Sequence, residues 1–378
     1  MKLQDLETPC LILDQDKLSN NIHKMNVHLK SLGAKIRPHV KTVKSIDIIN
    51  MAMNDQCIGI TVSTLKEAEY FLDKGIKDIV YAVGIAPVKL DHVAELMKNG
   101  ADLKIILDNI EQSKAVVQKG KELNITYQVL LEIDCDGHRS GIKPNDPALV
   151  KIGKYLNDHD GAELEGVLTH AGESYNCKSV EAIKQLAAKE RILSISCAET
   201  LRENNLPCPI VSIGSTPTAT FTNNLSGITE VRTGVYMFQD LVMAGLGVCD
   251  VNDIALSVLA SVIGYQKEKG WIIIDAGWLT LSRDRGTASQ KVDQGYGLVC
   301  NEYGKPLPDL IVSGTNQEHG IISDRNGKQI NYRNFPIGSM LRILPNHACA
   351  TAAAHNHYNL VHTDSTKVID VWKRINGW

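Results

Sequence analysis

A lysine in the run Arg37–Thr42 (RPHVKT) has the type and setting that covalent catalysis needs. Lys41 follows Pro38 at the end of a predicted strand, Lys35–His39. A lysine amine that is desolvated or lies near other cations can form a Schiff base with a carbonyl compound. A single lysine is more often a solvated surface residue, so this interpretation needs support from elsewhere in the chain.

A second run, Gly214–Thr218 (GSTPT), combines a glycine with several hydroxyl side chains just before a predicted helix. Backbone N–H groups and hydroxyls at the start of a helix are suited to hold a phosphate group. An ordinary turn that caps a helix has the same composition and stays open as an alternative. Together, a lysine at a strand end and a later phosphate cradle point to pyridoxal 5′-phosphate (PLP).

His347 and Cys349 are two residues apart in the segment Pro345–Thr351 (PNHACAT). In an extended strand such residues point to the same face, so we expect both side chains to reach one ion. An imidazole with a soft thiolate suits Zn²⁺ better than Mg²⁺ or Ca²⁺. A buried cysteine beside a packed histidine is the alternative. His355 and His357 form a second possible pair, but exposed polar residues near a turn explain it better.

The elements that must position these residues follow from the hydrophobic pattern. Apolar runs of strand length alternate with amphipathic helical segments over the first two thirds of the chain, which predicts a parallel sheet. About eight repeats favour a closed (β/α)₈ barrel, whose functional side chains gather at the carboxyl ends of the strands. A doubly wound sheet is the alternative, but no GxGxxG follows the first strand. The predicted strands are Cys10–Asp14, Lys35–His39, Cys57–Val62, Asp78–Val83, Leu103–Asp108, Tyr127–Asp134, Leu164–His170 and Pro209–Ile213.

The pattern changes near residue 245, where short apolar runs separated by frequent glycines begin. Such a pattern is typical of an antiparallel β domain. We therefore predict a barrel over residues 1–245, whose first few residues could pack with the second domain. The β domain is predicted over residues 246–378 and carries His347 and Cys349.

Composition excludes several classes of function. The formal net charge is −3 and aromatic residues make up 5% of the chain, which argues against nucleic-acid binding. No run approaches the roughly 18 consecutive apolar residues of a membrane span. The first ten residues are too polar for a signal peptide. Nine scattered cysteines without a CxxC pair indicate free thiols, and so a cytoplasmic protein.

The three motifs RPHVKT, GSTPT and PNHACAT together resemble the D-serine dehydratase and D-threonine aldolase family, from Glu7–Asp14 (ETPCLILD) onward. These are fold-type III PLP enzymes, related to alanine racemase through the barrel. The resemblance implies that PLP is attached to Lys41 and that His170 stacks on its ring. It also implies that the phenolic oxygen of PLP lies beside Arg139, that its phosphate lies at the GSTPT turn, and that its pyridine nitrogen lies opposite Arg232. The implied cofactor-binding positions are Lys41, Arg139, His170, Tyr175, Ser215, Thr216, Arg232, Gly234, Val235 and Tyr236.

The same resemblance implies Zn²⁺ on His347 and Cys349. Members with His-x-Cys look like dehydratases and members with His-x-Asp look like aldolases, so the implied activity is a dehydratase. Its substrate would be a D-3-hydroxy amino acid such as D-serine, D-threonine or 3-hydroxyaspartate, converted to a 2-oxo acid and ammonia. Aldol cleavage to glycine and an aldehyde stays the alternative; a racemase or a non-catalytic PLP carrier is less favoured.

Two further expectations come from the resemblance. It implies a homodimer in which the β domain of one chain closes the barrel mouth of the other, with the active site at the interface. The chain also departs from the family pattern, because Val43 stands where relatives usually carry a histidine. If that histidine handles a substrate proton, another residue must do so in this chain.

Overall fold

The computed structural model describes all 378 residues. The chain forms two units, and each unit is built from several separate segments of the chain. The barrel unit comprises Met25–Lys41, Ile49–Gly234 and Gly377–Trp378. The sheet unit comprises Met1–Lys24, Thr42–Ile48 and Val235–Asn376. Lys41 is thus the last residue of a barrel segment, and Thr42 begins a segment of the sheet unit.

The barrel unit contains eight parallel strands in the order β2-β9-β8-β7-β6-β5-β4-β3. Bridges between Ile36 and Cys57 and between His39 and Thr61 join the chain segments around β2 and β3, which closes the barrel. This confirms the predicted fold class. The strands are β2 Lys35–Pro38, β3 Ile60–Val62, β4 Asp78–Gly84, β5 Asp102–Leu107, β6 Tyr127–Ile133, β7 Ala162–Thr169, β8 Ile210–Ile213 and β9 Glu230–Thr233.

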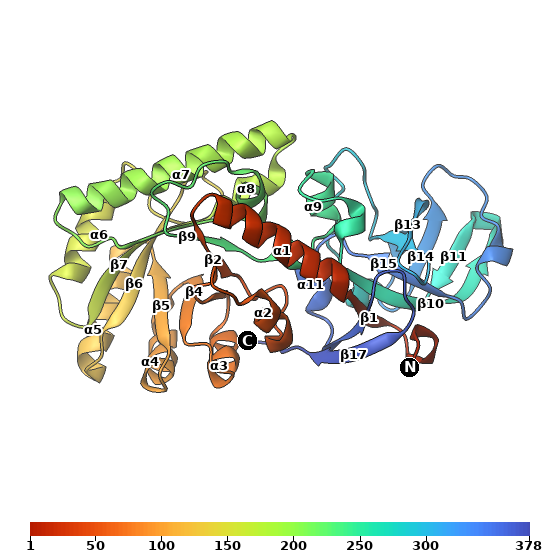
Figure 1. Cartoon of the computed structure of the whole chain (residues 1–378), viewed down its shortest axis with the longest axis horizontal. Helices are drawn as coiled ribbons and strands as arrows, with labels where there is room; N and C mark the ends of the chain where they lie inside the picture. The colour runs from red at the N-terminus through yellow and green to blue at the C-terminus, as the bar shows by residue number, and fades with distance from the viewer. The chain divides into compact units, whose positions relative to one another are not determined.

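Helices lie around the outside of these strands (Figure 1). One helix start was visible in the sequence, because Thr64 accepts a hydrogen bond from the Glu67 backbone N–H at 3.0 Å and caps α3. Val80, Ile106, Leu130 and Leu168, from four neighbouring strands, form one fully buried cluster. The helices are α2 Ile46–Ala52, α3 Leu65–Asp73, α4 Leu90–Lys98, α5 Ile110–Leu123, α6 Ala148–Asn157, α7 Val180–Glu203 and α8 Thr216–Phe221.

One predicted barrel strand lies elsewhere. Strand β1, Cys10–Asp14, pairs antiparallel with β10 and parallel with β16 in the sheet unit. Its place in the barrel is taken by β9, Glu230–Thr233, which the sequence analysis did not identify as a strand. Four of the five residues of β1 are apolar, which suits burial in either sheet, so hydrophobicity did not distinguish them. Strand β9 alternates charged with uncharged residues, and its charges are buried only because they have partners inside the barrel.

The sheet unit is built on nine strands in the order β11-β14-β13-β12-β15-β10-β1-β16-β17, all antiparallel pairs except β1 with β16. This is the predicted antiparallel sheet. The strands are β10 Leu256–Gln266, β11 Trp271–Ile274, β12 Leu298–Cys300, β13 Pro306–Thr315, β14 Gly320–Asp324, β15 Met340–Leu344, β16 His357–Val361 and β17 Val368–Lys373. The remaining helices are α1 Gln15–Ser31, α9 Leu241–Gly245, α10 Trp278–Leu281 and α11 Ala348–Ala352.

Short 3₁₀ helices complete the connections. They are η1 Leu3–Asp5, η2 Pro87–Lys89, η3 Gly172–Asn176, η4 Val235–Met237, η5 Val251–Asp253, η6 Lys267–Lys269 and η7 Tyr332–Asn334. None of the helices has both the length and the apolar character needed to cross a membrane.

Candidate active site

The segment that carries Lys41 is held on both sides at the carboxyl end of β2. The His39 N–H donates to the Thr233 carbonyl at 2.8 Å, and the Val40 N–H donates to the Thr61 carbonyl at 2.9 Å. Lys41 follows directly, and its side chain is exposed. Burial, and then the charge of Lys41, hold the pKa of His39 well below its usual value. The lysine is therefore presented at a fixed strand end beside an uncharged histidine.

His170 lies in the loop after β7 and points toward the next loop. Its Nδ1 is 2.9 Å from the Gly214 carbonyl oxygen. Because a carbonyl only accepts, that nitrogen carries the proton. Burial lowers the pKa of His170 to about 3, so the ring is neutral at physiological pH. The Tyr175 ring lies 6.4 Å away, centroid to centroid. The loop thus offers a flat, uncharged ring of the kind that stacks on a pyridine.

The GSTPT run forms a capped helix start, as one alternative predicted. The Ser215 hydroxyl accepts from the Thr218 N–H at 3.3 Å, and the Thr218 hydroxyl accepts from the Ser215 N–H at 3.2 Å. The Ser215 hydroxyl is also 2.8 Å from that of Ser174, and Thr216 Oγ1 is 2.6 Å from Thr233 Oγ1. The loops after β7, β8 and β9 therefore meet through a cluster of buried hydroxyls.

Glu190, on α7, is a buried residue of this region that the sequence analysis missed. Its Oε1 accepts from the Ala171 N–H at 3.1 Å and from the Gly214 N–H at 3.0 Å. One carboxylate thus joins the His170 loop to the GSTPT loop. Burial raises the pKa of Glu190 to about 7, and hydrogen bonds from Thr218 and the two backbone groups offset part of that rise. Its spacing from Ile183 and Ala187 on the buried face of α7 was the available signal.

The two arginines expected beside the cofactor differ in their surroundings. Arg232 is buried, donating from Nη1 to the Ser212 hydroxyl and from Nη2 to the Thr169 carbonyl, both at 2.6 Å. Burial lowers the pKa of Arg232 to about 10, which leaves it protonated. The Arg139 side chain, in the loop after β6, is 60% exposed. Its Nη2 lies 3.5 Å from Glu132 Oε1. Gly234 follows β9, while Val235 and Tyr236 begin η4 and are buried in the sheet unit.

His347 and Cys349 come together in the sheet unit. His347 Nδ1 is 2.7 Å from Asp284 Oδ2, and the imidazole also forms a hydrogen bond with the Cys349 side chain. Burial acts against protonation, but these two partners raise the pKa of His347 to about 11. The Cys349 Sγ is in addition 3.1 Å from Thr42 Oγ1. Thr42 is joined to Lys41 by one peptide bond, so the chain itself connects the two motifs.

The backbone around this pair corrects the predicted extended strand. Strand β15 ends at Leu344; His347 is extended, with φ −134° and ψ 103°, and caps α11, whose first turn contains Cys349. A helix start, not strand alternation, brings the two side chains together. Asp240 accepts from the Ala348 N–H at 3.0 Å, and the Asn346 amide donates to the backbone carbonyls of Asp284 and Gly295. Asp284 was missed because 63 residues separate it from His347.

The residues fit both PLP and Zn²⁺, the two groups that the sequence predicts. At the metal pair, Asp284 occupies Nδ1 of His347 and leaves Nε2 as a ligand beside a thiol, an arrangement typical of metal-binding histidines. No set of three His, Cys, Asp or Glu side chains gathers as a metal site, so two protein ligands leave positions for water or substrate. At the barrel, an exposed lysine, a neutral ring and a protonated arginine match the chemistry of PLP.

Two other predicted features have structural explanations. Val43 is fully buried, and its carbonyl accepts from the Tyr358 hydroxyl at 2.7 Å. Its apolar side chain offers no proton, and the consequence for substrate handling stays a prediction. His355 is directed at the Thr280 carbonyl at 3.3 Å, and burial lowers its pKa to about 4. The His355–His357 pair therefore gains no support as a second metal site.

Comparison with known proteins places this architecture in one class. Residues 13–241 match the family model of the alanine racemase N-terminal domain, and residues 255–361 match that of a putative serine dehydratase domain. This barrel followed by this second domain defines a fold-type III PLP enzyme. The chain belongs to the family of D-serine dehydratase-like lyases, which also includes the D-threonine aldolases.

Relatives cover the whole chain. D-threo-3-hydroxyaspartate dehydratase of Delftia sp. is 48% identical over 100% of this chain and 99% of its own, and its solved structure superposes with a TM-score of 0.97. D-serine dehydratase of Dictyostelium discoideum is 33% identical over 100% of this chain and 98% of its own. The structure of D-threonine aldolase from Filomicrobium marinum, 25% identical, covers 99% of this chain and 96% of its own with a TM-score of 0.82.

Proposed function

We propose that this protein is a PLP- and zinc-dependent dehydratase of D-3-hydroxy amino acids, with D-threo-3-hydroxyaspartate as the preferred substrate. Overall, the substrate loses water and the resulting enamine is hydrolysed, which gives a 2-oxo acid and ammonia. The observation that carries the proposal is the His347–Cys349 pair, in which Asp284 forms a hydrogen bond with His347. A metal site with open positions suits the departure of hydroxide, which is a poor leaving group.

The barrel residues would bind the cofactor and move the first proton. When bound, PLP supplies an electron sink for cleavage of the Cα–H bond. The amine of Lys41 would attach the cofactor and, when free, act as the base that takes the Cα proton. The neutral ring of His170 would pack on the cofactor without adding charge. Arg232 only donates, and so would keep the ring nitrogen unprotonated.

The sheet-unit residues would hold the metal. A bound Zn²⁺ supplies a Lewis acid for the β-hydroxyl oxygen. Asp284 would fix a proton of His347 on Nδ1 and leave Nε2 as the nitrogen that can bind the ion. The Cys349 thiolate favours zinc over harder ions. Solved structures of the Delftia enzyme support this assignment. They include a histidine-to-alanine and a cysteine-to-alanine variant two positions apart, the latter metal-free, which is the spacing of His347 and Cys349.

The test is a product assay on purified protein supplied with PLP and Zn²⁺. With D-threo-3-hydroxyaspartate we expect oxaloacetate and ammonia in equal amounts, and a lower rate with D-serine and D-threonine. The aldolase alternative has relatives as well, such as the 3-hydroxy-D-aspartate aldolase of Paracoccus denitrificans, 28% identical. Glycine and glyoxylate as the main products would overturn the dehydratase proposal in favour of that activity.

We also propose that the protein is a homodimer whose active sites lie at the subunit interface. The support is the family resemblance and the open positions at the metal pair. Light scattering at micromolar concentration should give twice the chain mass of 41.5 kDa. A fully active monomer at that concentration would contradict this proposal without touching the chemistry.

A further inference from the structure

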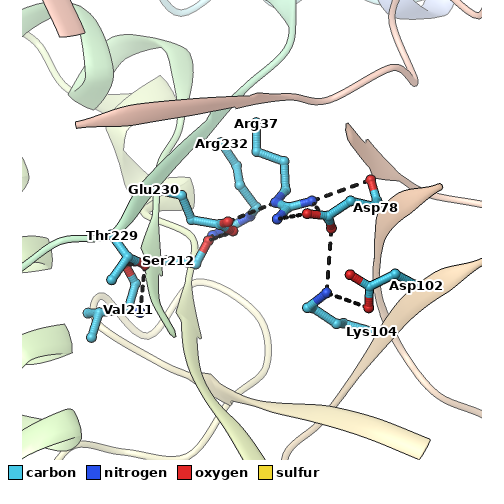
Figure 2. A network of polar contacts seen from close by, with 9 residues as sticks. All are labelled: Arg37, Asp78, Asp102, Lys104, Val211, Ser212, Thr229, Glu230 and Arg232. Carbon is cyan, nitrogen blue, oxygen red and sulfur yellow. Dashed lines mark hydrogen bonds and ion pairs between the residues drawn. The ribbon is translucent and has the colours of Figure 1, made fainter. Parts of the chain in front are cut away.

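A row of alternating charges crosses the barrel interior and ends at Arg232 (Figure 2). Arg37 is 2% exposed and binds two carboxylates: its Nε is 2.8 Å from Glu230 Oε2 and its Nη1 is 2.7 Å from Asp78 Oδ1. The other oxygen of Glu230, Oε1, accepts from the Ser212 hydroxyl at 2.6 Å. Ser212 Oγ in turn accepts from Arg232 Nη1 at 2.6 Å. The order is therefore Asp78, Arg37, Glu230, Ser212, Arg232.

The direction of each hydrogen bond at Ser212 is fixed. A guanidinium has only donors and a carboxylate has only acceptors. The single Ser212 proton must therefore point to Glu230, and a lone pair must face Arg232. No carboxylate forms a salt bridge with Arg232. The charges of Glu230, Glu190 and Glu132 act on it from a distance, and Glu230 is also linked to it through the Ser212 hydroxyl by two hydrogen bonds.

The strand register of the barrel places these side chains together. Ser212 on β8 is the Cα partner of Glu230 on β9, and Arg37 on β2 is the Cα partner of Arg232. Three adjacent strands therefore contribute all four groups. The partners also act on the charge of Arg37: although burial works against it, Glu230 and Asp78 raise the pKa of its guanidinium. Each charge in the row is held from two sides.

We propose that Ser212 and Glu230 are positioning residues that hold Arg232 in the orientation the cofactor ring needs. This inference rests on the proposed function, in which Arg232 faces the ring nitrogen of PLP. Without the Ser212 hydroxyl, a buried guanidinium loses one of its acceptors, and a direct pair with Glu230 becomes the favourable arrangement. Without the Glu230 carboxylate, the Ser212 proton is no longer held on that side, and its lone pair need not face Arg232. In either case Arg232 would turn away from the ring, and the ring nitrogen would become free to take a proton.

The far end of the row provides a matched control. Lys104 Nζ binds Asp102 Oδ1 at 2.9 Å and Asp78 Oδ1 at 3.5 Å. The Asp102 side chain is 47% exposed and is separated from Ser212 by Lys104, Asp78, Arg37 and Glu230. Asp102→Asn removes a charge from the same network without altering the groups next to Arg232. A general loss of barrel stability would appear in this variant as well as in the others.

The experiment titrates metal-supplied apoprotein with PLP and follows the absorbance of bound PLP from pH 5.5 to 9. Ser212→Ala and Glu230→Gln are compared with wild type and Asp102→Asn. We expect a pH-dependent step in the absorbance of Ser212→Ala and Glu230→Gln that is absent from wild type and Asp102→Asn. The Kd of these two variants for PLP should also rise about tenfold, as for a lost hydrogen bond to a charged group. Ser212→Thr, which keeps the hydroxyl, should restore the wild-type spectrum.

The outcomes separate the two proposals. Wild type that does not bind PLP would overturn the proposed function, and this inference with it. Wild type that binds PLP through Lys41, with Ser212→Ala and Glu230→Gln matching Asp102→Asn in both spectrum and Kd, would overturn the positioning role alone. If Ser212→Ala does not fold, Glu230→Gln decides, because it retains the size and shape of the native side chain.

Discussion

The barrel and the sheet unit assemble their functional side chains in different ways. The proposed cofactor positions of the barrel are spread from Lys41 to Gly234, and parallel strands present their carboxyl ends at one rim. The proposed metal ligands, His347 and Cys349, lie two residues apart, and a distant carboxylate, Asp284, forms a hydrogen bond with His347. Dispersed sites depend on the register of a whole sheet. A contiguous site depends on one turn and a few hydrogen bonds.

The two regions also shift the pKa of a histidine in opposite directions. Burial with only a backbone acceptor lowers the pKa of His170 to about 3. His347 is half-buried, and Asp284 and Cys349 raise its pKa to about 11 although desolvation acts against this. A charged partner therefore decides the outcome, not burial itself. The first environment suits a ring that stacks without charge; the second suits an imidazole already oriented for a cation, which must displace its Nε2 proton.

The largest effect should come from Lys41→Ala. The variant removes both the attachment point of PLP and the proposed base, so we expect turnover to fall by roughly 10³-fold or more. The absorbance of covalently attached PLP should disappear with it. Lys44→Ala is the control, since it removes a lysine from the same segment, and both properties should survive. A yellow Lys41→Ala protein alongside a colourless Lys44→Ala protein would refute the assignment.

Metal removal should impair turnover through the sheet unit and leave PLP binding in the barrel unchanged. Chelation, or Cys349→Ala, should lower turnover by about 10²-fold or more while the absorbance of bound PLP stays the same, because the Lewis acid acts on the leaving group. Added Zn²⁺ should restore the chelated wild type. Cys349→Asp should shift metal preference toward Mn²⁺ or Mg²⁺. Full activity of a protein shown to contain no metal would falsify the metal role.

A smaller effect is expected from Asp284→Asn. The amide still reaches His347 but no longer carries a charge, so zinc affinity should fall about 10- to 100-fold. A competition titration with a chromogenic chelator measures this change. Asp293→Asn is the control, because Asp293 binds Arg285 at 2.6 Å and is not bonded to His347. Equal zinc affinities in the two variants would show that Asp284 does not orient the ligand.

The smallest effect concerns Glu190 and the stability of the barrel. The folded-state pKa of about 7 lies above the ordinary 4.5, so the folded protein holds a proton that the unfolded chain has released. The free energy of unfolding therefore falls as pH rises from 4.5 to 7. Glu190→Gln should match wild type near pH 4.5 and exceed it above pH 7 by on the order of 1 to 3 kcal/mol.

Urea denaturation of the apoprotein at several pH values measures this difference. Glu203→Gln, which changes an exposed glutamate on the same helix, α7, should show no gain that depends on pH. A constant offset between Glu190→Gln and wild type across the range would mean that the buried carboxylate is ionised throughout, and would contradict the raised pKa.

The sequence by itself determined much of this protein. Alternating apolar runs and helical periods predicted the barrel, because each parallel strand must be covered by a helix. The change near residue 245 predicted an antiparallel sheet, and both parts are present. The three short motifs predicted the family, which the relatives confirm. Local patterns sufficed here because strand and helix periodicity, and motif spacing, are properties of neighbouring residues.

Only the tertiary structure decided which strands belong together. Strand β1 is apolar except for Asp14 and pairs in the sheet unit, whereas β9 pairs in the barrel despite Glu230 and Arg232. Its charges are stabilised by Arg37 and Ser212, whose positions depend on strand register. Asp284 and Glu190 reach their partners across many residues of chain. Such contacts depend on closure of the fold, so no local spacing in the sequence specifies them.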